Sequence, residues 1–283
     1  MRILLVALAG LLITTACAPP DGGAPEPGPA TSSEISDSSG ALGFPAGAVA
    51  DYQLGGPYQP SEGTKIVVRD STAARAPGFY NICYVNGFQT QPGERDLWLS
   101  ERRDLVLVGR DGRPMIDENW PDELIVDTST AAKRARLTHI IGETINTCAT
   151  KGFDAIEFDN LDSYSRSRGE LTVADNLELA TALASTAHAA GLLVGQKNAA
   201  ELSEQGRRQA RFDFAIAEEC LSFHECDSYT AGYGERVIDI EYTDNLPGAP
   251  DAVCARDDRP RSTVIRDRRL VTPGTAGYFH RSC

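Results

Sequence analysis

The sequence predicts one folded domain of the α/β class, a (β/α)8 barrel of the TIM type. Three observations lead to this prediction: short apolar runs recur along the chain, helical segments separate the later runs, and carboxylates follow two of them. Runs rich in Val, Ile and Leu without alternation are typical of parallel strands covered on both faces. The folded part, residues 49–283, has the length of a single barrel.

Eight apolar runs are predicted strands, and helices are predicted between the later ones. The runs cover residues 65–69, 79–85, 105–108, 124–126, 155–158, 192–194, 212–217 and 237–240. Apolar residues at helical spacing predict a helix over 137–148, and Gly152 follows as its stop. Thr172 and Asp175 form a capping-box pattern that starts a second helix, which Gly191 ends. The first third of the chain is richer in strands and turns, so the pairing of its runs stays open.

The N-terminus has the pattern of a targeting segment. Residues 1–16 combine Arg2, an apolar run and small residues, which is typical of a signal peptide, and the run is too short to span a bilayer. Cys17 follows directly and resembles the lipidated cysteine of a bacterial lipoprotein, with plain secretion as the alternative. The remainder of residues 17–48 is mostly Pro, Gly and Ser, which predicts a flexible tether. We therefore expect an extracytoplasmic protein, either a lipoprotein of the bacterial cell membrane or a secreted one.

The chain is acidic, with a formal net charge of -13 at pH 7. This charge argues against nucleic acid or an anionic membrane surface as the partner. It favours a cationic substrate, while solubility of an exported protein is the alternative explanation. Contact with a membrane is expected only through a lipid anchor at Cys17.

Six cysteines remain once Cys17 is set aside, and an even number in an exported chain indicates disulfides. Six cysteines allow fifteen pairings. Cys220 and Cys226 would close a short loop, Cys254 and Cys283 would hold the C-terminal segment, and Cys83 and Cys148 are then left by elimination. No pair has the C-x2-C spacing of a zinc site, and His224-Glu225-Cys226 is a weak metal pattern, so no metal is expected.

Two predicted strands deliver an acid at their carboxyl ends. Asp159 follows the run at 155–158, and Glu218 and Glu219 follow the run at 212–217. The active site of a barrel lies at this end of its strands. Asp159 can attack an anomeric carbon or stabilise an oxocarbenium ion, although a helix N-cap is the alternative. Glu218 is the predicted general acid/base, because an apolar surround or a second carboxylate would raise its pKa.

Further polar residues at strand ends are candidates for substrate binding. Adjacent residues on an extended backbone face opposite ways, so only one of Glu218 and Glu219 can readily enter the cleft. Aromatic faces pack on sugar rings, although Trp98, Trp120 and Tyr164 have core or rim packing as the alternative. The predicted substrate-binding residues are Asp51, Tyr52, Tyr84, Glu157, Asp162, Lys197, Asn198, Glu219, Glu241 and Tyr242.

Other enzyme classes lack their motifs in this chain. It contains no G-x-S-x-G elbow, no P-loop and no G-x-G-x-x-G fingerprint, so neither a serine hydrolase nor a nucleotide cofactor is expected. A pair of carboxylates needs no cofactor to cleave a glycosidic bond.

Several segments together resemble glycoside hydrolase family 114, the endo-α-1,4-polygalactosaminidases. The segments are Asp51-Tyr52-Gln53-Leu54-Gly55-Gly56, Asn81-Ile82-Cys83-Tyr84, residues 152–164, 187–198, 212–226 and 237–242. The most specific pieces are the Gly-Phe-Asp…Asp-Asn-x-Asp run and the Glu-Glu-Cys…Glu-Cys-Asp run. The resemblance implies a barrel with catalytic acids after its fourth and sixth strands, at Asp159 and Glu218, and it matches Lys197 and Asn198 to the Lys-Asn after the fifth.

The expected function is therefore that of an exported, monomeric endo-acting glycoside hydrolase that cleaves α-1,4-linked galactosamine polymers with two carboxylates. The acidic composition agrees with a polymer whose free amines are protonated. Two alternatives stay open: a barrel that binds an amino-sugar polymer without cutting it, and a glycosidase for another α-glycan such as an N-acetylated one.

Overall fold

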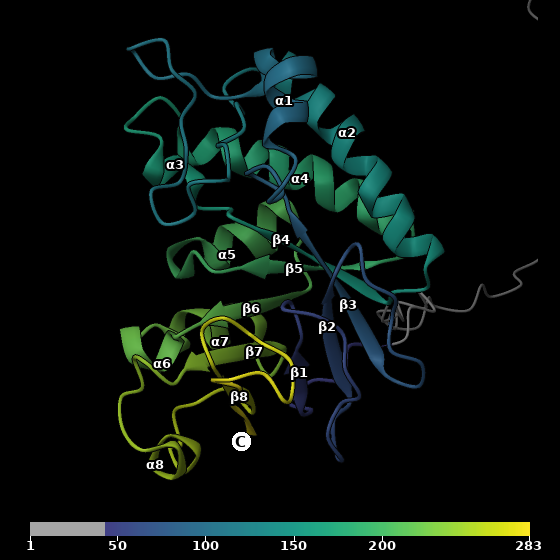
Figure 1. Ribbon diagram of the computed structural model, residues 1–283, viewed down its shortest axis with the longest axis vertical. Coiled ribbons are helices and arrows are strands. Elements are labelled where there is room, and N and C mark those ends of the chain that lie inside the picture. Colours follow the sequence, from purple (N-terminus) through teal and green to yellow (C-terminus); the bar gives the residue numbers. More distant parts are fainter. Residues whose placement is uncertain (1–42) are drawn as a thin grey trace, which may run out of the picture. The chain divides into compact units, whose positions relative to one another are not determined.

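The computed structural model describes residues 43–283 and contains a nearly closed barrel (Figure 1). Nine strands follow one another in chain order, and β1 to β8 pair in parallel while β9 is antiparallel to β8. The strands are β1 (Ala50–Tyr52), β2 (Ile66–Asp70), β3 (Tyr80–Asn86), β4 (Ala155–Asp159), β5 (Leu193–Lys197), β6 (Phe214–Glu218), β7 (Val237–Tyr242), β8 (Ser262–Arg266) and β9 (His280–Ser282). The predicted fold class is confirmed.

Two long helices cover one side of the barrel and lie side by side, α2 (Ala131–Thr150) and α4 (Val173–Ala189) (Figure 1). The predicted capping box at Thr172 and Asp175 starts α4. Glycines with positive φ follow both helices, Gly152 (80°) and Gly191 (84°), in a conformation that other residues adopt at a cost. The shorter helices are α1 (Arg95–Glu101), α3 (Ser163–Arg166), α5 (Ser203–Gln205), α6 (Cys220–Phe223), α7 (Cys226–Tyr233) and α8 (Pro250–Cys254), with helical turns η1 (Arg103–Leu105), η2 (Ala200–Leu202) and η3 (Gly206–Ala210).

Two of the predicted strands are not barrel strands, so that part of the prediction is wrong. Residues 105–108 and 124–126 lie in the long segment between β3 and α2, where they form isolated antiparallel bridges such as Val106 with Val126. Apart from Val108, which is 37% exposed, the residues of both runs are buried in this segment. A run of three or four apolar residues indicates burial rather than membership of a sheet. The barrel instead uses β1 and β8, which are flanked by turns and were not predicted.

Side chains bridge the first and last parallel strands. The guanidinium of Arg266, on β8, donates to the carbonyl oxygen of Tyr52, on β1, and Ser262 donates to the carbonyl of Ala48. At the other end of the barrel, the ring of Phe44 stacks on Phe214 with centroids 4.6 Å apart. Phe44 lies within the predicted tether, residues 17–48. In the structure its ring packs against apolar residues of the barrel.

Three disulfides join the cysteines of the described chain. The bonds are Cys83–Cys148, Cys220–Cys226 and Cys254–Cys283, which confirms the predicted pairing. The first ties β3 to the end of α2, and the third ties α8 to the C-terminus. The predicted signal peptide (1–16), the lipidated Cys17 and the tether up to residue 42 lie outside the described residues. Within residues 43–283 no helix has both the length and the apolar character needed to cross a membrane.

Candidate active site

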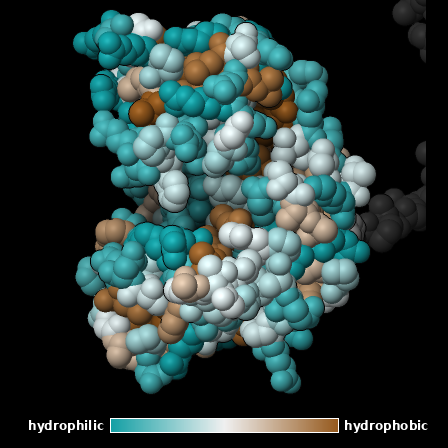
Figure 2. Space-filling model, in the orientation of Figure 1, coloured by the Kyte–Doolittle hydropathy of each residue, from teal (hydrophilic) through white to brown (hydrophobic). Residues whose placement is uncertain are grey.

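A cleft of about 1380 Å³ opens at the carboxyl ends of the strands. The surface is hollowed between the upper and lower parts of the molecule in Figure 2, and mostly hydrophilic residues border the hollow. The ends of β3, β4, β5, β6 and β7 all contribute to the lining, and so does the segment that follows β3. The cleft therefore brings together residues that are far apart in the sequence.

Lys197 lies at the centre of the site. Its Nζ is 3.5 Å from Oδ2 of Asp159, on β4, and 3.2 Å from Oε2 of Glu218, on β6. Its side chain is only 1% exposed, and Nζ also lies 3.1 Å from the hydroxyl of Tyr52. Burial opposes the charged form, but the surrounding carboxylates outweigh burial and hold the pKa of Lys197 well above its ordinary value. A buried cation thus sits between the two acids.

Asp159 is held in place by hydrogen bonds to both of its oxygens. The hydroxyl of Tyr84 donates to Oδ2 at 2.7 Å, and the backbone N–H of Asn160 donates to Oδ1 at 2.8 Å. The carboxylate lines the cleft. It does not cap the helix that follows, because α3 begins with Asp162 at its N-cap position.

Glu218 is held in the same manner from the opposite side. Asn198 donates from Nδ2 to Oε2 at 3.0 Å and accepts the backbone N–H of Glu218 at 2.8 Å. The hydroxyl of Tyr242 donates to Oε1. Burial favours the neutral acid, but Lys197 and these hydrogen bonds outweigh it, and the pKa of Glu218 lies below its ordinary value. The expectation of a raised pKa is therefore wrong, because the nearest charge is a cation and the surround is polar.

Of the adjacent acids, Glu218 lines the cleft and Glu219 does not. Glu219 adopts a positive φ of 62°, which turns its carboxylate away. Its Oε1 accepts from Arg268 at 2.7 Å and from Asn245 at 3.0 Å. The structure thus separates the two acids into one that faces the cleft and one that anchors a loop.

Glu157 lies beneath the site, inside the barrel. It is fully buried, and Tyr52 donates to its Oε1 at 2.8 Å while its Oε2 has no partner among the described residues. Burial raises the pKa of Glu157 to about 8, against the opposing effect of Lys197. The Tyr52–Glu157 pair therefore forms the floor on which Lys197 rests.

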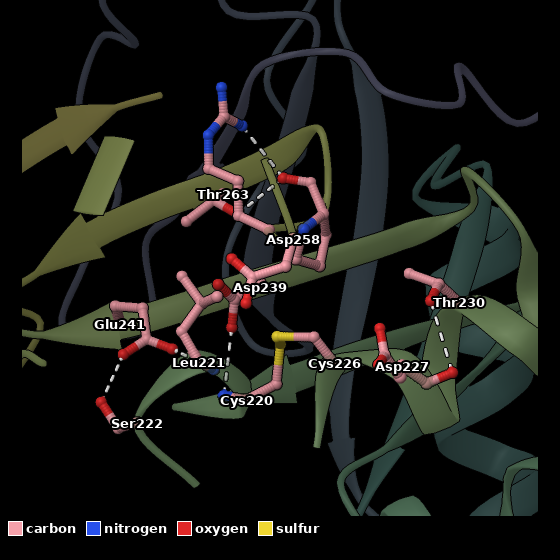
Figure 3. Close-up of a disulfide and its surroundings, with 12 residues drawn as sticks. Cys220, Leu221, Ser222, Cys226, Asp227, Thr230, Asp239, Glu241, Asp258 and Thr263 are labelled. Carbon is pink, nitrogen blue, oxygen red and sulfur yellow. Dashed lines mark hydrogen bonds between the residues drawn. A yellow bond between two sulfur atoms is a disulfide. The ribbon is translucent and has the colours of Figure 1, made fainter. Parts of the chain in front are cut away.

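Glu241 faces Leu221 and Ser222 of α6, as Figure 3 shows. Its carboxylate accepts the backbone N–H of Leu221 at 2.8 Å and the hydroxyl of Ser222 at 2.7 Å. Asp239, also fully buried, accepts the N–H of Cys220 at 3.3 Å beside the Cys220–Cys226 disulfide (Figure 3). These acids of β7 hold α6 in place below the end of β6.

Asp51 is also remote from the cleft lining. It is fully buried, accepts from the hydroxyl of Tyr58 at 2.6 Å and from Gln53 at 2.8 Å, and lies 3.6 Å from the guanidinium of Arg266. This cluster joins the first and last parallel strands, β1 and β8.

The predicted residues thus divide into three groups. Those that line the cleft are Tyr84, Asp159, Asp162, Lys197, Asn198, Glu218 and Tyr242; Tyr52 and Glu157 lie beneath it; Asp51, Glu219 and Glu241 point elsewhere. The cleft also contains residues that the sequence did not single out, among them Asn86, Gln89, Asp117, Glu123 and Arg166. Asn86 ends β3, so its position at a strand end was a usable signal, whereas the others lie on loops or a short helix.

Two carboxylates that face one cleft at the strand ends of a (β/α)8 barrel are the arrangement by which glycoside hydrolases work. The model of glycoside-hydrolase family GH114 matches residues 30–283, and the chain belongs to that family. It is therefore a glycoside hydrolase.

Solved structures share the barrel. The chain is similar to Ega3 of Aspergillus fumigatus, crystallised in complex with galactosamine, at 23% identity and a TM-score of 0.66 over 86% of this chain and 98% of the other. It is also similar to the glycoside hydrolase domain of PelA from Pseudomonas aeruginosa, at 14% identity and a TM-score of 0.53 over 81% and 98% of the two chains. No curated protein sequence matches the chain.

Proposed function

We propose that this protein is an endo-acting hydrolase of α-1,4-linked galactosamine polymers, with Asp159 and Glu218 as its catalytic pair. The observation that carries the proposal is that these two acids face one cleft from either side of Lys197. Family membership and the galactosamine bound to the structurally similar Ega3 support the choice of substrate.

In this proposal Asp159 acts on the anomeric carbon and Glu218 exchanges the proton. Tyr84 and the N–H of Asn160 orient Asp159, and Nζ of Lys197 lies 3.5 Å from its Oδ2. Because one ammonium nitrogen lies within 3.5 Å of an oxygen of each acid, the carboxylates are close together. Retaining enzymes hold their two carboxyl groups about 5–5.5 Å apart, a separation that these two distances allow, and we propose a retaining mechanism with a covalent intermediate on Asp159.

Glu218 must carry a proton to serve as the acid. The cation beside it lowers its pKa, so the protonated form becomes more abundant as the pH falls. We expect the rate of the acid-catalysed step to increase from neutral pH toward the acidic range for this reason.

The proposal includes export of the protein, with removal of residues 1–16 and a lipid anchor at Cys17. Three disulfides support an oxidising compartment. The mass of the mature N-terminal peptide tests this part: a diacylglyceryl cysteine at position 17 supports the anchor, and an unmodified N-terminus contradicts it.

The central experiment measures oligosaccharides released from α-1,4-galactosamine polymer by mass spectrometry. Wild type should release short oligosaccharides, and Asp159→Asn and Glu218→Gln should release none while unfolding near the wild-type temperature. Glu219→Gln is the matched control, since its carboxylate faces Arg268, and it should retain cleavage.

Other outcomes would overturn the assignment. Polymer that stays bound and uncut by wild type would indicate a binding barrel. Cleavage of the N-acetylated polymer alone would indicate another α-glycan, and full activity in both amide variants would remove Asp159 and Glu218 from the mechanism.

A further inference from the structure

One wall of the cleft is formed by a turn whose acids the predicted site did not include. Asp117 and Glu123 close this turn, since the N–H of Asp117 donates to the carbonyl of Glu123 at 3.2 Å. Trp120 lies at its tip with 61% of its surface exposed, and all three residues line the cleft. We call residues 117–123 the acidic turn.

Glu123 presents an acceptor without a donor. Glu123 is 7% exposed, and its Oε2 accepts from Nδ2 of Asn86 at 2.8 Å. Its Oε1 accepts no hydrogen bond from any of residues 43–283, although the side chain lines the cleft. This oxygen is open to the cleft, so a ligand bound there can supply the donor that the protein does not.

Gln89 adds a second acceptor to the same wall. Its Nε2 donates to Oδ2 of Asp117 at 2.9 Å, which fixes the orientation of the amide. Its Oε1 is buried and has no donor within the described residues. The wall therefore holds more acceptors than donors.

The charge of Arg166 lowers the pKa of Glu123, but Arg166 makes its ion pairs with other residues of the described chain. Arg166, from α3, is engaged with Asp117 at 2.9 Å, with Asp162 at 2.8 Å and with Asn160 at 2.8 Å. The charge of Glu123 is thus left for a partner from the cleft.

The acidic turn is connected to the catalytic centre. Asn86 donates to Glu123 and accepts from Nδ2 of Asn160 at 2.9 Å, and the N–H of Asn160 donates to Asp159. A sugar bound at the turn would therefore lie beside the sugar at Asp159. The exposed ring of Trp120 could pack on one face of the sugar at the turn.

A primary ammonium is the group that complements this wall, because it offers three N–H donors and no acceptor. An N-acetylated nitrogen offers a single donor and adds a carbonyl acceptor. We propose that Glu123 on the acidic turn is a specificity-determining residue, which binds the protonated amine of a hexosamine in a subsite beside the catalytic pair. The inference rests on the proposed function and names the group that this part of the cleft recognises.

The charges around Glu123 predict how binding depends on pH. Burial raises the pKa of Glu123 to about 7, with Asp159 from β4 and Asp117 from the turn acting in the same direction and Arg166 from α3, with the Asn86 hydrogen bond, opposing it. A bound ammonium stabilises the charged carboxylate, so the free site must lose a proton to bind. Affinity should fall up to tenfold for each pH unit below about 7.

The test compares KM and kcat for α-1,4-galactosamine oligosaccharides and their N-acetylated counterparts between pH 5 and 8. Glu123→Gln should raise KM for the free-amine substrate about 10- to 100-fold at pH 7.5, the effect of one charge-assisted hydrogen bond, with kcat within about threefold. It should also abolish the dependence of KM on pH below 7. For the N-acetylated substrate the variant should match wild type.

Glu118→Gln is the matched control, because Glu118 lies on the same turn, is 80% exposed and pairs with Arg168 at the surface. The inference would be overturned if Glu123→Gln kept the wild-type KM and its pH dependence, or if Glu118→Gln raised KM as much as Glu123→Gln does. The proposed function would stand in either case, provided that wild type cleaves the polymer.

If wild type cleaves neither substrate, the proposed function fails, and calorimetry with galactosamine at pH 6 and 8 tests the subsite alone. Binding that is stronger at pH 8 and is lost in Glu123→Gln supports the subsite. Binding that is absent, or equal in both proteins, overturns it.

Discussion

Replacement of Lys197 by methionine removes the cation between the two acids. Methionine has a similar length and no charge, so it fills the space and leaves both carboxylates without their counterion. Loss of one member of a buried ion pair costs about 3–5 kcal/mol. The side chains of Asp159 and Glu218 are 17% and 27% exposed, so water solvates their charges in part. We therefore expect the substitution to lower the free energy of unfolding by about 3 kcal/mol at pH 8.

The loss should be smaller at acidic pH. In wild type the pKa of Glu218 is lowered, so its contribution to stability is present above its ordinary pKa and disappears as the pH falls through the lowered one. Without Lys197, only the hydrogen bonds from Tyr242 and Asn198 oppose burial, so the pKa of Glu218 rises and the variant loses stability as the pH rises. One pKa unit corresponds to about 1.4 kcal/mol, and we expect the loss at pH 5 to be about half of that at pH 8.

Urea unfolding followed by tryptophan fluorescence measures both losses. Lys133→Met is the control, since Lys133 pairs with Asp127 near the surface, and its cost should stay below about 1 kcal/mol and not change between pH 5 and 8. A loss below 1 kcal/mol for Lys197→Met, or an equal loss at both pH values, would refute the reasoning that the cation compensates two buried charges.

Two further predictions concern stability away from the catalytic pair. Burial and the neighbouring Glu241 raise the pKa of Asp239 well above its ordinary value, so its neutral form is favoured in the fold and stability is lost as the pH rises. At pH 5 the free energy of unfolding of Asp239→Asn should lie within about 1 kcal/mol of the wild-type value, and at pH 9 the variant should be the more stable protein. A higher free energy of unfolding for wild type at pH 9 would contradict this prediction. Removal of Cys83–Cys148, with a separation of 65 residues, should cost about 4 kcal/mol and removal of Cys220–Cys226, with a separation of 6, about 2. Chemical denaturation of the paired serine variants measures both costs, and a reversed order would count against the loop-entropy account.

The prediction from sequence was accurate where a feature is local. Asp159 and Glu218 each follow an apolar run, and position at a strand end can be read from a few neighbouring residues. The capping box of α4 is equally local. The runs at 105–108 and 124–126 were misassigned because burial makes a run apolar whether or not it pairs in the barrel.

The properties of the site depend on contacts between distant segments. Glu157, Glu219 and Glu241 looked alike in the sequence as acids near strand ends, yet one lies on the barrel floor and two hold loops. Glu123 had no strand end to mark it, and it reaches the cleft only because the segment after β3 folds back over the barrel.

By itself the sequence determined the barrel class and the two acids at the ends of β4 and β6, because strand ends and apolar runs are properties of short stretches. Only the tertiary structure decided the lowered pKa of Glu218 and the partners of the other acids. A pKa depends on burial and on the charges within a few ångströms, and here Lys197 reaches Asp159 and Glu218 across three different strands.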